Sequence, residues 1–189
     1  MEQAPKMTVR GLRFFYGTKP AIHGIDLIGY LGGGYLDVGL RYQDVGAGGG
    51  RAANILMDCM MGSGAVARLE FLPVVGRGSE SVTIHTDTHT YVARFPGTAY
   101  ESDSSLTIYA ADRLVREVTP SDMGEGTQLF EVCGFYHEIA TFLDELGTTG
   151  VNTHSGIETA LQSVALAEAV RNRDAAWSAS AMEYTRPPI

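Results

Sequence analysis

Three consecutive segments between residues 55 and 118 alternate apolar and polar side chains on both sides of a short turn. The turns are centred on Gly62-Ser63-Gly64, Asp87-Thr88-His89 and Ala111-Asp112. Alternation with a period of two predicts strands with one buried face, and short turns of this composition join antiparallel neighbours. The sequence therefore predicts three hairpins in a row and a largely antiparallel sheet.

The region before these hairpins predicts two further strands and a helix. Thr8 to Phe15 is a strand-like run, and Leu36 to Gln43 repeats the period-two alternation. Pro20 suits the first turn of a helix, because the amide that it lacks has no partner there. We expect this helix to run to about Leu31 and to stop at the three glycines 32–34.

Two helices are predicted to close the chain. The first carries one apolar stripe that can pack on the sheet, formed by Val132, Phe135, Ile139, Phe142 and Leu146. The second begins at a capping box of Ser155 and Glu158 and continues to about Arg171. The tail, residues 176–189, either adds an edge strand or wraps a neighbouring subunit. The predicted fold class is α+β: one domain over residues 1–189, with an open, mostly antiparallel sheet and helices on one face.

Composition excludes several classes of partner. The chain of 189 residues has 14 basic and 22 acidic side chains, and its net charge of -8 repels nucleic acid and anionic lipid. Met1 to Arg10 contains no apolar stretch of signal-peptide length, and no segment approaches the ~20 apolar residues that span a bilayer. We expect a cytoplasmic protein with no nucleic-acid or membrane partner. Cys59 and Cys133 lie among apolar neighbours and are predicted to be buried thiols.

The predicted first helix offers a candidate site. Four polar side chains fall at i, i+4, i+7 and i+11, which places them on one helix face: Lys19, His23, Asp26 and Tyr30. Leu27, Ile28 and Leu31 are expected to turn toward the core. Such a row can bind a substrate and exchange protons with it, and Asp26 can orient His23 or raise its basicity. The alternative is a solvated helix face without a catalytic role.

A glycine-rich loop suggests a nucleotide site that its surroundings do not favour. Asp44 to Gly50 fits the D-x-G-x-G-x-G pattern of methyltransferases, whereas a dinucleotide G-x-G-x-x-G pattern fails because Arg51 stands at its third glycine. A methyltransferase requires a buried apolar strand before the loop and alternating strands and helices after it. Residues 41–43 are polar and hairpins follow, so we expect a loop between antiparallel strands.

The other polar clusters give weaker signals. His85, Asp87 and His89 alternate and would point to one side of a continuous strand as metal ligands, but their turn-like setting breaks that alignment. We therefore expect no metal site. His137 and Glu138 flank the apolar stripe of the first closing helix, where a structural role is expected, and His154 is expected in a loop.

Four segments in this order resemble the C-terminal domain of the Gfo/Idh/MocA oxidoreductases. They are Ile22 to Ile28, Gly62 to Val66, Val82 to Phe95, and the closing helices from Phe130 to Val170. The resemblance implies an open, mostly antiparallel sheet whose second face pairs subunits. It also implies a substrate that is often a sugar or polyol. His23, in an H-x-x-D segment with Asp26, looks like the catalytic histidine of the family.

The departures from the family shape the functional expectation. Complete enzymes carry an upstream Rossmann domain that holds NAD or NADP and a catalytic Lys, and we expect this protein to lack that half. Lys19 replaces an Asp that usually stands four residues before the histidine. We therefore expect no cofactor, and a stand-alone relative of the substrate domain that binds a small polar or biosynthetic molecule.

Several functions are open to such a domain. Acid–base chemistry through His23, with Lys19 stabilising developing negative charge, would catalyse an isomerisation, elimination or cyclisation. The alternatives are a non-catalytic ligand-binding module, the detached half of a split NAD(P)-dependent oxidoreductase with a separate Rossmann chain, or a fragment of a complete dehydrogenase; a methyltransferase is remote.

Subunit pairing is a separate expectation. Leu56 and Met60 alternate with Ile55, Met57 and Cys59, so both faces of that strand carry apolar side chains. A sheet covered by helices on one side only would leave a patch that needs cover. We expect a homodimer through the second face of the sheet.

Overall fold

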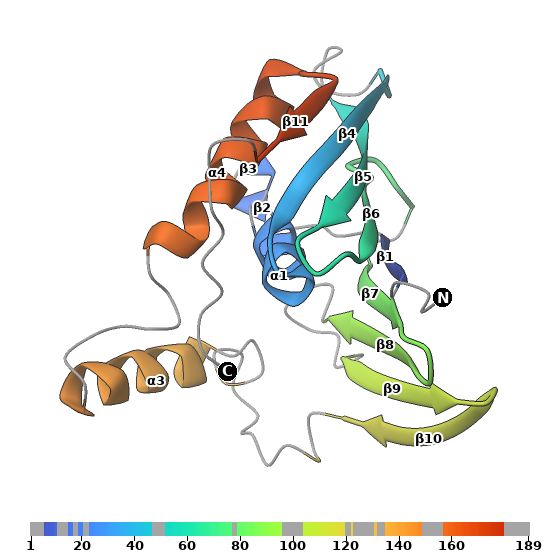
Figure 1. Ribbon diagram of the computed structural model, residues 1–189, viewed down its shortest axis with the longest axis vertical. Coiled ribbons are helices and arrows are strands. Elements are labelled where there is room, and N and C mark those ends of the chain that lie inside the picture. The colour runs from blue at the N-terminus through green and yellow to red at the C-terminus, as the bar shows by residue number, and fades with distance from the viewer. Residues whose placement is uncertain are drawn as a thin grey trace.

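The chain folds around a nine-stranded sheet in which one neighbouring pair is parallel and the others are antiparallel (Figure 1). The structure is a computed structural model. It describes residues 6–10, 15–16, 19–20, 23–46, 52–76, 79–95, 104–119, 122, 131, 135–148 and 157–179. Across the sheet the strand order is β10-β9-β8-β7-β1-β6-β5-β4-β11. The fold class is α+β, as the sequence predicts.

The three predicted hairpins are confirmed. The strands that form this part of the sheet are β4 (Tyr35–Asp44), β5 (Ala53–Met61), β6 (Val66–Phe71), β7 (Glu80–His85), β8 (Thr90–Phe95), β9 (Ser105–Ala110) and β10 (Arg113–Val118). The β5–β6 turn is closed by the Met61 amide on the Ala65 carbonyl at 2.9 Å. In the β9–β10 turn Ala111 and Asp112 both have positive φ, 48° and 59°, as a two-residue hairpin turn requires.

The N-terminal strand differs from the prediction. The expected run from Thr8 to Phe15 overlaps the end of β1 (Lys6–Arg10) and the start of β2 (Phe15–Tyr16), and residues 11–14 lie outside the described part. β1 lies between β6 and β7, parallel to the former and antiparallel to the latter. β2 pairs with β3 (Lys19–Pro20) in a separate two-stranded sheet.

The described start of the tail forms an edge strand. β11 (Ala176–Ser178) pairs antiparallel with β4, so this part of the tail takes the first of the two predicted alternatives. Residues 180–189 lie outside the described part.

Three helices are described: α1 (His23–Gly32), α3 (Phe135–Thr148) and α4 (Ile157–Asn172). α1 ends as predicted, because Gly33 and Gly34 adopt positive φ and the Gly34 amide caps the Gly29 carbonyl at 2.7 Å. α4 begins and ends close to the predicted positions, although Ser155 of the expected capping box lies outside the described residues.

The core lies between one face of the sheet and the helices α1 and α4 (Figure 1). Register places a continuous row of apolar positions across that face: Trp177, Val38, Cys59, Ala67, Met7, Ile84, Tyr91 and Ile108. α1 contributes Ile25 and Ile28 to the core, and α4 contributes Leu166 and Ala169. The strands of the core are mainly β4, β5 and β6, so the two helices are fixed over this half of the sheet.

α3 does not bury its predicted apolar stripe. Ile139, Phe142 and Leu146 are exposed, as are Tyr136 and Leu143. Val132 lies outside the described residues. The expectation that the described stripe packs on the sheet is therefore wrong, because α1 and α4 are the helices that supply the core over β4, β5 and β6.

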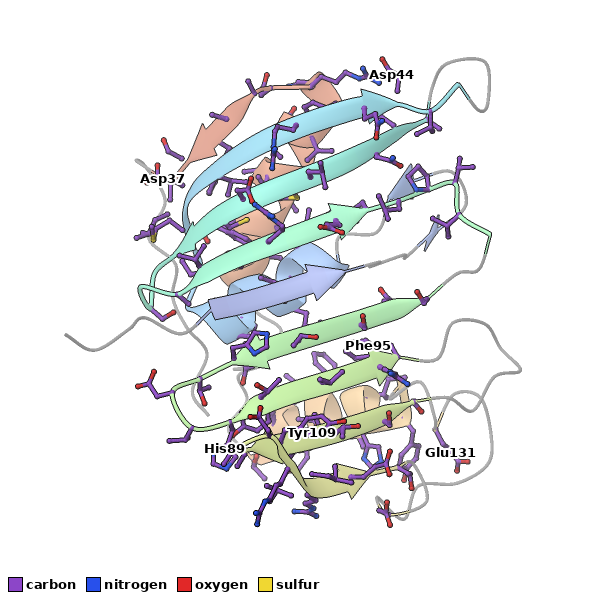
Figure 2. All side chains as sticks on the ribbon, turned by 90° about the vertical axis from the view of Figure 1, so that its right-hand side faces the viewer. Asp37, Asp44, His89, Phe95, Tyr109 and Glu131 are labelled. Atoms are coloured by element: carbon purple, nitrogen blue, oxygen red, sulfur yellow. The ribbon has the colours of Figure 1, made fainter. Side chains whose placement is uncertain are left out.

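The opposite face of the sheet carries both charged and apolar side chains (Figure 2). Asp58 on β5 accepts hydrogen bonds from Arg41 and Arg68 on the neighbouring strands, each at 2.7 Å. Met60 is exposed, whereas Leu56 is only partly exposed. The prediction that both faces of β5 are apolar is thus corrected, since Asp58 stands between Leu56 and Met60 on the second face and forms two ion pairs.

No helix in the described part of the chain is both long enough and apolar enough to cross a membrane.

Candidate functional site

α1 presents part of the predicted polar row. Ile25 and Ile28 are buried against the core, and Leu27 is partly buried there. Asp26 is exposed and Tyr30 is partly exposed, as a helix with one apolar face requires. Leu31 is exposed, so its predicted place in the core is wrong; it stands in the last turn, where α1 gives way to the glycines.

Lys19 does not lie on the helix. It belongs to β3, where it pairs with Tyr16, and α1 begins only at His23. The reason is local: a residue that precedes proline is disfavoured in the helical region, and Pro20 therefore holds Lys19 in an extended conformation. The predicted row of four residues on one face is thereby reduced to the three that α1 carries, which are His23, Asp26 and Tyr30.

Asp26 is held by a buried serine of α4. The Ser163 hydroxyl donates a hydrogen bond of 2.8 Å to Oδ1 of Asp26. Ser163 is only 3% exposed, and a buried hydroxyl requires a partner. The bond joins two helices that also pack against each other. The carboxylate thus has one oxygen fixed by the protein interior.

A second set of hydrogen bonds links α1 to β4 and β4 to α4. The Tyr35 hydroxyl, at the start of β4, donates to the carbonyl of Ile25. The Tyr35 amide donates to Oε1 of Gln162 at 2.9 Å, and Nε2 of Gln162 donates to the Tyr35 carbonyl at 3.4 Å. Tyr35 and Gln162 are both buried. Ile25 and Gln162, which stand next to Asp26 and Ser163, therefore join α1 and α4 to β4 through their hydrogen bonds with Tyr35.

His23 is the first residue of α1, and its side chain lies outside the described part. The spacing of three residues places His23 and Asp26 as neighbours on a helix. An imidazole and a carboxylate at that spacing can accept, hold and return a proton. The role of His23 stays a prediction.

Sequence reasoning missed Ser163 and Gln162, although the pattern of α4 contained a signal. Residues 162, 163, 166 and 169 recur at helical spacing, and all four are buried. Two polar residues in the buried stripe of a helix indicate specific hydrogen-bond partners. The sequence does not show which residues those partners are.

The glycine-rich loop does not have the setting of a nucleotide site. β4 and β5, which it joins, are antiparallel neighbours, whereas the methyltransferase pattern needs a strand followed by a helix. Asp44 at its start accepts a 2.6 Å hydrogen bond from Arg173, and this bond lowers the pKa of the Asp44 carboxyl. Residues 47–51 lie outside the described part.

The remaining clusters do not converge on a site. The His85 ring contacts Thr90 and the His89 ring contacts Thr88. Within the described residues, no three His, Cys, Asp or Glu side chains come together as metal ligands. His137 is exposed on α3, the side chain of Glu138 is not described, and His154 lies outside the described part.

Cys59 is expected to be unreactive in the native protein. It is buried in the core, and burial, with a smaller contribution from the charge of Asp58, raises the pKa of its thiol to about 12. The reactive thiolate is therefore scarce at pH 8. In a Cys133→Ser variant, a thiol-reactive disulfide reagent should label Cys59 only after unfolding in urea. Complete labelling of the folded protein within minutes would contradict the buried position.

Comparison with solved structures shows the same fold in oxidoreductases. UDP-N-acetylglucosamine 3-dehydrogenase from Acidithiobacillus ferrooxidans matches with a TM-score of 0.64 at 20% identity, over 95% of this chain and 54% of that one. Aldose-aldose oxidoreductase from Caulobacter crescentus, complexed with glycerol, matches with a TM-score of 0.65 at 13% identity, over 92% and 55%. Levoglucosan dehydrogenase, in complex with NADH and levoglucosan, matches with a TM-score of 0.64 at 15% identity, over 94% and 58%.

These relatives are Gfo/Idh/MocA-family oxidoreductases, and this chain spans little more than half of their length. At such identities the likeness is one of fold, and it is the fold that the sequence resemblance implies. No protein-family model matches the chain, and no curated protein matches it significantly.

Proposed function

We propose that this chain is the substrate-binding part of an oxidoreductase-type fold, and that it binds a small hydroxylated molecule on the exposed side of α1. His23 serves as general base or acid, Asp26 orients it, and Tyr30 contacts the ligand. Lys19, four residues before His23 in the chain, stabilises developing negative charge. The observation that carries the proposal is the carboxylate of Asp26, exposed on α1 and anchored by Ser163 of α4.

Chemistry supports a polar, hydroxyl-bearing ligand. A carboxylate and a phenol are suitable partners for hydroxyl groups, because the former accepts and the latter both donates and accepts hydrogen bonds. The solved relatives named above act on or contain UDP-N-acetylglucosamine, aldoses, levoglucosan and glycerol, all of which carry hydroxyl groups. Proton transfer alone is sufficient for an isomerisation, an elimination or a ring closure, and none of these needs a hydride carrier.

Replacing His23 by alanine should weaken ligand binding at least tenfold, which is about the contribution of one hydrogen bond to a charged or strongly polar group. The measurement is isothermal titration calorimetry with UDP-N-acetylglucosamine and levoglucosan as probes. His137→Ala is the matched control, because it removes an exposed histidine from α3. If a probe that binds the wild-type chain binds the His23 variant equally well, His23 is not part of the site.

A second function is favoured by the length comparison. The chain covers 54% to 58% of the three relatives, and one of them holds NADH. We propose as the alternative that the chain supplies the substrate half of an NAD(P)-dependent enzyme whose nucleotide half lies elsewhere. NADH fluorescence should then change only when a separate Rossmann-domain protein is present. Saturable NADH binding by this chain alone would contradict both proposals.

We further propose that two copies pair through the second face of the sheet. Exposed apolar side chains of β4, β5 and β6 lie next to the Asp58 cluster, toward the β5–β6 turn, namely Leu36, Met60 and Val66. Sedimentation should give a dimer at micromolar concentration, and Met60→Glu should shift it toward monomer because it buries a charge in the interface. Leu143→Glu on α3 is the control and should leave the dimer intact. A wild-type monomer at that concentration would contradict the proposal.

A further inference from the structure

Ser163 occupies a place on α4 where an apolar residue would be expected. It lies in the stripe that also contains Leu166 and Ala169, and both of these belong to the core. A hydroxyl in such a place is stabilising only when its hydrogen bond is made. The Ser163 hydroxyl donates its one hydrogen bond to Asp26 on the neighbouring helix α1. The position of Ser163 is therefore explained by its bond to Asp26.

The way in which Asp26 is held differs from that of two other carboxylates with side-chain partners. Asp58 is paired with Arg41 and Arg68, and Asp44 is paired with Arg173, so positive charge offsets both. Asp26 is held by a neutral hydroxyl, which fixes the position of one carboxyl oxygen and brings no positive charge to it. Within the described residues, Oδ2 of Asp26 has no hydrogen-bond partner.

Gln162, the residue before Ser163, makes it possible to distinguish an effect on the position of Asp26 from a general loss of stability. Both polar ends of its side chain bond the backbone of Tyr35. Gln162 therefore ties α4 to β4, whereas Ser163 ties α4 to the carboxylate. Two adjacent buried polar residues thus have different partners, and substitution can test them one at a time.

We propose that Ser163 is a positioning residue: it fixes one oxygen of Asp26 so that the other oxygen orients the imidazole of His23. The inference rests on the proposed function, because it takes His23 to be the acid–base group. A carboxylate that bonds one ring nitrogen of a histidine determines which nitrogen carries the proton. Loss of the Ser163 hydroxyl leaves Asp26 free to rotate, and His23 then loses its preferred tautomer.

The test uses the ¹⁵N chemical shifts of the His23 ring in the chain without ligand, since these shifts report the tautomer ratio. Asp26→Asn and Ser163→Ala should both move the ratio toward that of free histidine, and the double variant should move it no further. Ser163→Thr, which keeps the hydroxyl, should restore the wild-type ratio. Gln162→Met is the matched control and should leave the ratio unchanged while it lowers the urea midpoint.

Two results would overturn the inference. If Asp26→Asn changes the ratio and Ser163→Ala does not, Ser163 does not position the carboxylate. If neither substitution changes the tautomer ratio, Asp26 does not orient His23 and Ser163 has no positioning role. Both results are independent of the calorimetry with His23→Ala. A failure of the proposed binding function is therefore distinguished from a failure of the positioning role of Ser163.

Discussion

Replacing Gly62 by alanine is expected to lower the free energy of unfolding by about 3 kcal/mol, a typical effect of overpacking together with broken hydrogen bonds. A Cβ atom on Gly62 would overlap the carbonyl oxygen of Gly33. The two backbones are held in contact by the Gly62 amide on the Gly34 carbonyl at 2.9 Å and the Ser63 amide on the Gly32 carbonyl at 3.0 Å. The clash can be relieved only if these bonds lengthen.

The matched control is Gly76→Ala, because a Cβ at that position meets no atom within 4 Å and Gly76 has no positive φ. Its effect should stay within about 0.5 kcal/mol, as for most surface substitutions. Urea unfolding followed by circular dichroism measures both variants. Equal stability of the Gly62 and Gly76 variants would mean that the β5–β6 turn does not hold the end of α1 in place.

The parts of the fold that the sequence predicts correctly depend on local signals. The turn at Ala111 and Asp112 connects strands that are adjacent in the chain, and the glycines after Gly32 end α1 by their own backbone preference. The place of β1 depends on distant partners instead: Met7 pairs with both Ala67 and Ile84. Nothing within the segment 6–10 identifies these partners, so sequence reasoning could not insert β1 between two hairpins.

The candidate site shows the same division. The spacing of His23, Asp26 and Tyr30 on α1 follows from helical periodicity, whereas the displacement of Lys19 follows from the effect of Pro20 on the residue before it, which the prediction did not weigh. The bond from Ser163 to Asp26 spans 137 positions and required the structure. The sequence of α3 predicts that the helix has an apolar face, but it does not show what packs against that face.

Leu166→Ala is expected to destabilise the chain by about 2 to 5 kcal/mol, the range for truncating a leucine in a packed core. Leu166 is 0% exposed, and it lies one turn after Gln162 and Ser163 on the face of α4 that meets the core. Leu161→Ala removes the same atoms from the same helix at a position that is 49% exposed, and its effect should stay below about 1 kcal/mol. Urea midpoints of both variants measure the difference. Because Leu166 and Ala169 pack α4 into the core, the loss should also weaken the Ser163 bond to Asp26. The tautomer ratio of the His23 ring should then move toward that of free histidine before global unfolding. Similar midpoints for the two leucine variants would mean that α4 is not packed on the sheet as described, and the support for Asp26 would fail with it.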